Sequence, residues 1–130
     1  MLTCGDKVYT QSTAVARVAA RKAGLMPTDE EELYQVDNLI AAVEDLKSLG
    51  YQAMPQFGAT EEAVQKYIKE QLPLHLGNFN RILGEQEWFV GSKMTMADVY
   101  VYDLFSSQCT ALVPDSLNDF PKLQALFKRV

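Results

Sequence analysis

The sequence predicts a mainly α-helical protein in which a short β-hairpin and one helix precede a helical bundle. Apolar residues recur at spacings of three and four through most of the chain, which is the period of a helix with one buried face. Helix-start and helix-stop residues separate these runs. With 130 residues, of which 48% are hydrophobic and 22% charged, the chain is long enough to bury a core of its own.

The only strand-like stretches lie at the beginning of the chain, in residues 2–4 and 7–10. Gly5-Asp6 separates them, and this pair tolerates the positive φ angles of a two-residue hairpin turn. An isolated hairpin is marginal in water and its edges are normally paired in a larger sheet. We therefore expect the hairpin to be the remnant of a larger sheet.

An alanine-rich run over residues 13–22 predicts the first helix, with Ser12 as a hydroxyl N-cap and Gly24 as the stop. The next helix is expected to begin with a capping box in which Thr28 caps the amide of Glu31. Gly50 is expected to end it. Its apolar stripe comprises Leu33, Val36, Leu39, Ile40, Val43, Leu46 and Leu49, while Asp37, Glu44 and Asp45 lie off the stripe.

Thr60 is the expected start of a third long helix, which ends at Gly84. Pro73 lies inside it, and an interior proline removes a backbone hydrogen bond and clashes with the preceding turn. A kink at residues 69–72 is therefore predicted. The loop that follows contains Trp88, which we interpret as a structural anchor.

The clearest helix start in the chain is Thr95 with Asp98, a capping box in which the carboxylate reaches back to the helix N-terminus. Little charge surrounds the apolar residues after it, so this helix is expected to run through the core. Pro121 begins a last helix, which reaches Val130 without a stop signal, as though the natural chain continued.

Composition narrows the range of partners. Twelve Lys and Arg against seventeen Asp and Glu give a net charge of −5, the wrong sign for neutralising nucleic-acid phosphates. No apolar run is long enough to span a bilayer, and no basic amphipathic helix suggests binding to a membrane surface. Cys4 and Cys109 show no metal-ligand spacing, and we expect two buried or half-buried free thiols in a soluble, cytoplasmic protein.

Three segments together resemble the cytosolic glutathione transferases. Within that family, the segments are most similar to the sigma-like class and the related pi, mu and alpha classes. They are GDKVYTQSTAVARVAARKAGL at residues 5–25, VDNLIAAVEDL at residues 36–46, and EWFVGSKMTMADVYVYDL at residues 87–104. The resemblance implies that residues 1–25 end an incomplete thioredoxin-like, glutathione-binding domain. Residues 28–130 would then be the all-helical C-terminal domain with its last helix cut short.

The resemblance also implies roles for particular residues. Gln11 and Ser12 match the pair that holds the γ-glutamyl group of glutathione, although Ser12 as a plain N-cap and Gln11 as a surface residue remain alternatives. The apolar pocket for the second substrate would be lined by Tyr100 and Leu104, with Val43 and Ser48 opposite. An apolar stripe at helical spacing is also typical of plain core.

Other features of the family are missing or altered. No residue matches the Tyr or Ser hydroxyl that stabilises the glutathione thiolate, and Tyr9 is expected to pack rather than replace it. The acidic residue that many members use for the partner subunit's ligand is replaced by Ala41. Asp37 and Glu44 could substitute in part, or could simply form a solvated helix face. Arg17 is interpreted as a surface or dimer-interface charge.

The function that the resemblance implies is conjugation or binding of glutathione and small hydrophobic electrophiles, in a homodimer and without a metal. The 130 residues alone are expected to be inactive. The alternative is a non-catalytic dimerisation or interaction module built on the same fold. His75, the only histidine, lacks a Ser, Cys or acidic partner for a triad and is assigned no catalytic role.

Overall fold

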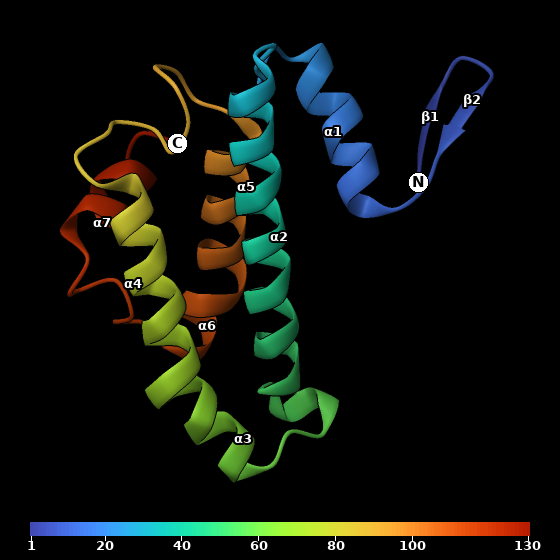
Figure 1. Cartoon of the computed structure of the whole chain (residues 1–130). Helices are drawn as coiled ribbons and strands as arrows, with labels where there is room; N and C mark the ends of the chain where they lie inside the picture. The colour runs from blue at the N-terminus through green and yellow to red at the C-terminus, as the bar shows by residue number, and fades with distance from the viewer.

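The computed structural model describes residues 1–130 and confirms a mainly helical chain with a hairpin at its beginning (Figure 1). The helices turn around one core, and the hairpin stands beside α1, away from the other helices. In chain order the elements are β1 (Leu2–Cys4), β2 (Lys7–Tyr9), α1 (Ser12–Lys22), α2 (Glu30–Gln52), a 3₁₀ turn (Pro55–Phe57), α3 (Glu61–Lys66), a π-helical turn (Tyr67–Gln71), α4 (Leu72–Leu83), α5 (Met96–Leu104), a second π-helical turn (Phe105–Cys109), α6 (Thr110–Leu112) and α7 (Pro121–Phe127).

The predicted hairpin is confirmed, with β1 and β2 pairing antiparallel and Leu2 opposite Tyr9. Gly5 has a φ of 61° whereas Asp6 does not have a positive φ, so only the first turn residue needs the freedom of glycine. The sheet has two strands, and Val8 on it is 58% exposed. The hairpin therefore contributes no side chain to the buried core.

Helix α2 begins one residue later than predicted, because the cap is Asp29 rather than Thr28. The Asp29 carboxylate accepts a hydrogen bond from the Glu32 amide at 3.0 Å, and three glutamates fill the first turn. The predicted stop at Gly50 is also wrong, since the helix continues to Gln52. The expected apolar stripe is confirmed in the buried residues Val36, Leu39, Ile40, Val43 and Leu46.

Gly50 serves close packing instead of helix termination. A Cβ built on it would lie 2.5 Å from both Cδ and Oε1 of Gln108, a contact far inside the van der Waals limit. The Gln108 side chain fills this space and donates from Nε2 to the Lys47 carbonyl at 3.1 Å. Gly50 thus lets the second π-helical turn approach the end of α2.

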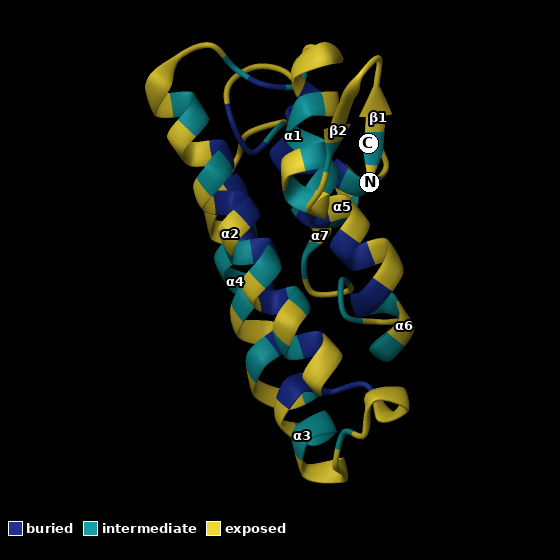
Figure 2. Ribbon diagram, turned by 90° about the vertical axis from the view of Figure 1, so that its right-hand side faces the viewer, coloured by how far each residue is buried: buried dark blue, intermediate teal, exposed yellow.

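The core lies between α2, α4, α5 and α7. Figure 2 shows that buried and exposed positions alternate along the helices of the bundle, as α5 illustrates. Helices α2 and α5 pack along one another. Phe79, Phe89 and Phe105 meet edge to face, with centroids 6.2 Å apart in each pair that shares Phe79. Phe127 on α7 packs against Phe105, with ring centroids 5.3 Å apart.

The predicted interruption near Pro73 is confirmed and takes the form of a π-helical turn between α3 and α4. The Leu72 amide bonds to the Tyr67 carbonyl five residues back, instead of the residue four back. Since Pro73 has no N–H, the Ile68 carbonyl receives neither an i+4 nor an i+5 amide. Thr60 caps α3 as expected, accepting from the Ala63 amide at 3.2 Å.

Asp98 confirms the predicted capping box and adds a contact that the sequence does not show. The side chain is fully buried, and its Oδ2 accepts from the Thr95 amide at 2.7 Å and from the Thr95 hydroxyl at 3.1 Å. Its Oδ1 accepts from the Phe89 amide at 2.9 Å. One carboxylate therefore joins the loop before α5 to the helix itself.

The first amide of α5 also leaves its own helix. The Met96 amide donates to the Leu25 carbonyl at 2.8 Å, which fixes the link between α1 and α2 to the start of α5. In the loop before it, the Arg129 guanidinium lies 5.5 Å from the Trp88 ring centroid. Trp88 packs against the core, as expected of a loop anchor. No helix of the structure combines the length and apolarity needed to cross a membrane.

Replacing Asp98 should unfold the protein most readily of any single polar change in the bundle. Asp98→Ala leaves two buried amides and a hydroxyl without an acceptor and should lower the free energy of unfolding by about 3 kcal/mol. Asp103→Asn, an exposed aspartate on the same helix, should change it by less than about 0.5 kcal/mol. Urea denaturation checks both values, and equal effects would contradict this role for Asp98.

A comparison of two helical glycines tests the packing role of Gly50. Gly77→Ala on α4, where an added Cβ meets nothing within 4 Å, should stabilise the protein by about 0.5–1 kcal/mol. Gly50→Ala should destabilise it, because the Gln108 side chain must move and lose its bond to Lys47. In a Gln108→Ala background the Gly50→Ala change should become stabilising. Additive effects in this double-mutant cycle would show that the contact is unimportant.

The buried Tyr67 hydroxyl lies 3.7 Å from Cys109 Sγ and makes stability depend on alkaline pH. Burial raises the pKa of the Cys109 thiol from 9.0 to about 11, despite the hydrogen bond from Tyr67, and burial also raises the pKa of the Tyr67 phenol. Between these pH values the unfolded chain loses the thiol proton while the folded chain keeps it. The contribution of Cys109 to the free energy of unfolding should thus be constant below about pH 9 and fall by roughly 2 kcal/mol towards pH 11, and Tyr67 should add to the fall.

Denaturation curves across this pH range check the prediction. The double variant Tyr67→Phe and Cys109→Ala lacks both groups, so its stability, although lower throughout, should decline less steeply over the same interval. An unchanged slope in the double variant would assign the pH dependence to other groups.

Candidate functional site

Gln11 and Ser12 lie at the N-terminus of α1, where the structure shows strained backbone. Gln11 is the only non-glycine residue with a positive φ, at 68°, and its ψ is 117°. Such a conformation costs of order 1–3 kcal/mol for a residue with a side chain and clusters at functional sites. Both side chains are exposed. The strain marks this turn as the first candidate site.

The prediction that Ser12 caps α1 through its hydroxyl is wrong. Ser12 is the first residue of the helix and Gln11 occupies the cap position, where no side chain bonds to the helix amides. Only the Val15 amide reaches back to the Gln11 carbonyl, so the amides of residues 12–14 have no backbone acceptor. These free donors and the positive end of the helix dipole suit an anion such as a carboxylate.

Two polar contacts hold α1 against α2. Arg17 forms an ion pair with Asp37, and its second guanidinium nitrogen donates to Asp37 Oδ2 at 2.8 Å. The hydrogen bond to Asp37 raises the pKa of Arg17 against the opposing effect of burial, and Tyr100 adds a smaller favourable contribution. The Thr13 hydroxyl contacts Glu44 Oε1 at 3.5 Å. Asp37 is thus a partner of α1, and the alternative of a merely solvated face is wrong for this residue. Glu44 makes only the one contact to Thr13.

The four residues predicted to line an apolar pocket are distributed between core and surface. Val43 is 2% exposed and Leu104 is 1% exposed, and both belong to the core cluster. Ser48 is exposed on α2, where its Oγ accepts from Gln52 Nε2 at 3.5 Å. Tyr100 is half-buried against the core. None of the larger surface hollows is lined by these side chains, and the pocket stays a prediction.

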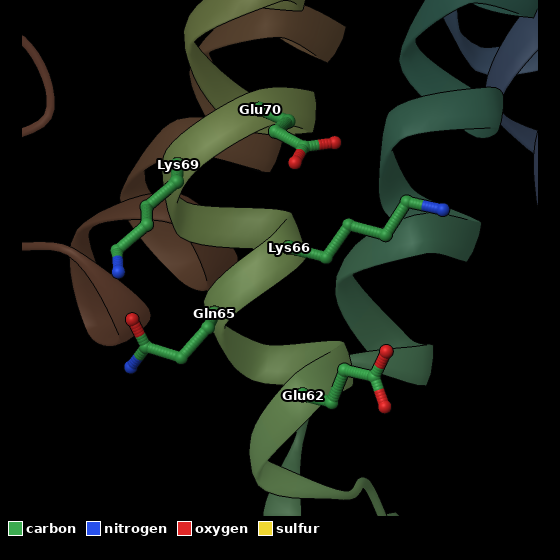
Figure 3. Close-up of a pocket in the computed structure, with 5 residues that line it drawn as sticks. All are labelled: Glu62, Gln65, Lys66, Lys69 and Glu70. Carbon is green, nitrogen blue, oxygen red and sulfur yellow. The ribbon is translucent and has the colours of Figure 1, made fainter.

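One hollow of about 430 Å³ lies along α3 and the π-helical turn that follows it. Its lining contains no apolar residue and consists of Glu62, Gln65, Lys66, Lys69 and Glu70. Figure 3 shows that these side chains diverge: Gln65 and Lys69 point to one side of the helix, and Glu62, Lys66 and Glu70 to the other. Without converging groups or an apolar floor, this surface does not resemble a substrate pocket.

The remaining reactive side chains do not assemble a catalytic centre. Burial lowers the pKa of His75, with Asp45 acting in the opposite direction, and no hydrogen bond joins the imidazole to a nucleophile. Cys4 and Cys109 are both free, but Cys4 is exposed, contrary to the expectation of a buried or half-buried thiol. No group of three or more His, Cys, Asp or Glu residues is placed to hold a metal ion.

Two polar groups in the bundle were not predicted by the sequence pattern. Gln108 and Ser116 each have a buried oxygen without a hydrogen-bond partner. The segment PDSLND, which contains Ser116, has the turn-forming composition that would have directed attention to it. Nothing in the sequence marks Gln108, because its importance comes from its contact with Gly50.

Residues 30–130 match the family described as "Glutathione S-transferase, C-terminal domain". The chain is 32% identical to rat (Rattus norvegicus) glutathione S-transferase Mu 5 over 125 residues, covering 96% of this chain and 54% of that protein. It is 32% identical to rat hematopoietic prostaglandin D synthase over 92% of this chain and 60% of that protein. The chain thus spans about half to three-fifths of the length of these relatives.

Solved structures show the same arrangement. The prostaglandin synthase D of Nilaparvata lugens superposes with a TM-score of 0.84 over 97% of this chain and 64% of that one; at 23% identity this likeness shows the fold alone. Rat hPGDS complexed with a quinoline gives a TM-score of 0.80 at 32% identity, covering 92% of this chain and 60% of that one. Residues 30–130 therefore form a C-terminal domain of the glutathione S-transferase class. The chain belongs to the glutathione S-transferase family.

Proposed function

We propose that this chain binds glutathione at the N-terminus of α1, as part of a glutathione transferase that acts on small apolar electrophiles. The strained backbone of Gln11 is the observation that carries the proposal. It turns the chain so that Gln11 and Ser12 are exposed beside three helix amides without backbone acceptors. The γ-glutamyl carboxylate of glutathione is an anion of the size that these donors suit.

We propose different roles for the two parts of the chain. Residues 1–25 would be the end of a thioredoxin-like domain that holds glutathione, and residues 28–130 the helical domain that faces the second substrate. By its membership of the glutathione S-transferase family, we propose that this protein is a cytoplasmic homodimer. The matches cover only part of each relative. The proposed roles and the proposed dimer therefore apply to a complete transferase that contains these residues.

The second substrate is proposed to be a small hydrophobic electrophile that contacts Tyr100. Tyr100 is half-buried on α5 and lies near enough to Arg17 on α1 to raise the pKa of that guanidinium slightly. Rat hPGDS, which is similar in fold and sequence, is complexed with a quinoline, a flat aromatic molecule. Leu104 and Val43 would support this site from the core, and Ser48 would lie further along α2.

We expect these 130 residues to bind glutathione without conjugating it efficiently. The glutathione thiolate is the nucleophile, so its fraction sets the rate of attack on an electrophile. By resemblance to the family, no residue of this chain takes the place of the hydroxyl that stabilises the thiolate. We therefore expect weak glutathione binding with little conjugation, and no metal requirement.

A non-catalytic interaction module is the alternative, and two observations favour it. Asp37 is occupied by Arg17, so it is not free to replace the acidic residue absent at Ala41. Val43 and Leu104 are buried in the core, which leaves Tyr100 and Ser48 as the accessible members of the predicted pocket. A module of this kind would keep the fold without binding glutathione.

Glutathione titration of the ¹⁵N-labelled protein, followed by NMR, tests the proposal. Millimolar glutathione should shift the amides of residues 11–14, and Gln11→Ala or Ser12→Ala should weaken binding about three- to tenfold through loss of a hydrogen bond to a charged group. Gln86→Ala and Ser92→Ala, which remove exposed side chains of the same types elsewhere, should leave binding unchanged.

The variant Gln11→Gly tests whether the strained backbone at residue 11 is kept for glutathione binding and not for stability. Glycine adopts a positive φ without strain, so this variant should raise the free energy of unfolding while it weakens glutathione binding. No shift at residues 11–14 in saturating glutathione would eliminate the proposal and favour the interaction module. Clear binding without conjugation of an aromatic electrophile is the result that we expect.

A further inference from the structure

A second hollow, of about 270 Å³, lies between the beginning of α4 and the loop that joins α6 to α7. Leu72, Leu76 and the wall residue Ile68 supply apolar surface from the α4 side. Val113 and Phe120 supply it from the loop, and both also pack against the core. The hollow is distinct from the N-terminus of α1, because it shares no residue with that site.

Ser116 lines this hollow and has an unused hydroxyl. Its Oγ is inaccessible to water and has no hydrogen-bond partner, a state that costs about 1–3 kcal/mol for a buried polar group. A neighbouring apolar hollow of about 180 Å³ provides a comparison, since it contains the hydroxyls of Ser106 and Thr110. Both of those hydroxyls already donate to helix carbonyls. Ser116 is therefore the buried hydroxyl beside a hollow that lacks a partner within the chain.

Two carboxylates also line the hollow, at its solvent-exposed edge. Asp115 and Asp119 are exposed, and neither forms an ion pair within the chain. Lys69, the lysine next to the wall residue Ile68, pairs with neither of them. The Ile68 carbonyl adds a further acceptor, because the π-helical turn and Pro73 together deprive it of its helical donors. The charged groups around this apolar space are therefore both carboxylates, which accept hydrogen bonds and carry negative charge.

The loop that carries these groups is already ordered. The Ser116 amide donates to the Val113 carbonyl at 3.0 Å, and the Asn118 amide donates to the Asp115 carbonyl at 3.0 Å. Gln124 on α7 donates from Nε2 to the Leu117 carbonyl at 3.0 Å. A ligand that binds here would not have to order the loop, which is a cost that often limits affinity.

We propose that this hollow binds a small organic ammonium ion with an apolar body, of the arylalkylamine class. The aromatic ring would rest on Leu72, Leu76 and Phe120, and the ammonium group would lie between the two aspartates. An ammonium group carries three donors and no acceptor, which matches a rim that carries the carboxylates of Asp115 and Asp119. A hydrated metal ion would leave the apolar floor unfilled, and an anion would meet two carboxylates.

Phenethylamine is the probe that tests this site, in a calorimetric titration and an NMR titration of the whole chain. Shifts are expected at residues 68–76 and 113–120. The double variant Asp115→Asn and Asp119→Asn should weaken binding about five- to tenfold, because two solvent-exposed charge contacts are lost. Asparagine can keep the Oδ1 that accepts from Asn118 at 3.3 Å, so the turn should remain intact.

Matched controls test whether the hollow recognises the positive charge of the amine. Phenethyl alcohol has the same apolar body without the charge and should bind at least about fivefold more weakly than the amine. Asp6→Asn and Asp103→Asn remove exposed carboxylates away from the hollow and should leave amine affinity unchanged. Added glutathione should not compete, which separates the outcome from that of the α1 site.

Amine and alcohol binding with equal affinity, or amine binding that is insensitive to the double aspartate variant, would overturn the proposal. So would amine-induced shifts confined to other parts of the chain. Thermal unfolding of the double variant, unchanged from that of the parent, verifies that a loss of binding does not come from a loss of fold.

Discussion

The buried carboxylate of Asp98 is the interaction on which the arrangement of the other elements depends. It accepts hydrogen bonds from the Phe89 and Thr95 amides, so it fixes both the loop before α5 and the first turn of that helix. The next amide, that of Met96, bonds to the Leu25 carbonyl in the link between α1 and α2. The position of α5 in the core therefore fixes the position of the link that follows α1. A buried carboxylate without hydrogen-bond donors would be costly. The bonds to Asp98 therefore stabilise only the arrangement in which the loop before α5 and the first turn of α5 meet at this side chain.

Helix α1 carries the candidate glutathione site but is held to the bundle at its edge. Ala20 is its only buried residue, and the ion pair of Arg17 with Asp37 supplies a specific contact to α2. The Arg17 side chain is 30% exposed and that of Asp37 42% exposed, so solvent screens the pair and its contribution to stability is small. Its consequence is orientational, because two parallel contacts between a guanidinium and a carboxylate fix the rotation of α1 relative to α2. That rotation determines the direction in which Gln11 and Ser12 are presented.

Two π-helical turns interrupt the regular helices of the bundle, and polar groups without a helical hydrogen-bond partner lie at or beside these turns. The first separates α3 from α4 and leaves the Ile68 carbonyl without a helical donor. The second follows α5 and places Gln108 against Gly50 and Cys109 beside Tyr67. Such turns frequently occur at functional sites, because the extra residue releases backbone groups and redirects side chains. The proposed ammonium site lies beside the first of them.

The sequence by itself determined the features that arise from neighbours along the chain. The hairpin at Gly5, the apolar stripe of α2, the cap of Asp98 and the interruption near Pro73 follow from local sterics and hydrogen bonding, and the structure contains all of them. Contacts between distant segments decided the rest. Glycine is a residue that often ends helices, but Gly50 does not end α2. The side chain of Gln108, far along the chain, packs where a Gly50 side chain would lie. Asp37 has the pattern of a solvated residue until α1 brings Arg17 to it. The strain at Gln11 and the orphan hydroxyl of Ser116 likewise exist only once the chain is folded, because a periodic pattern records which face is buried but not which groups meet there.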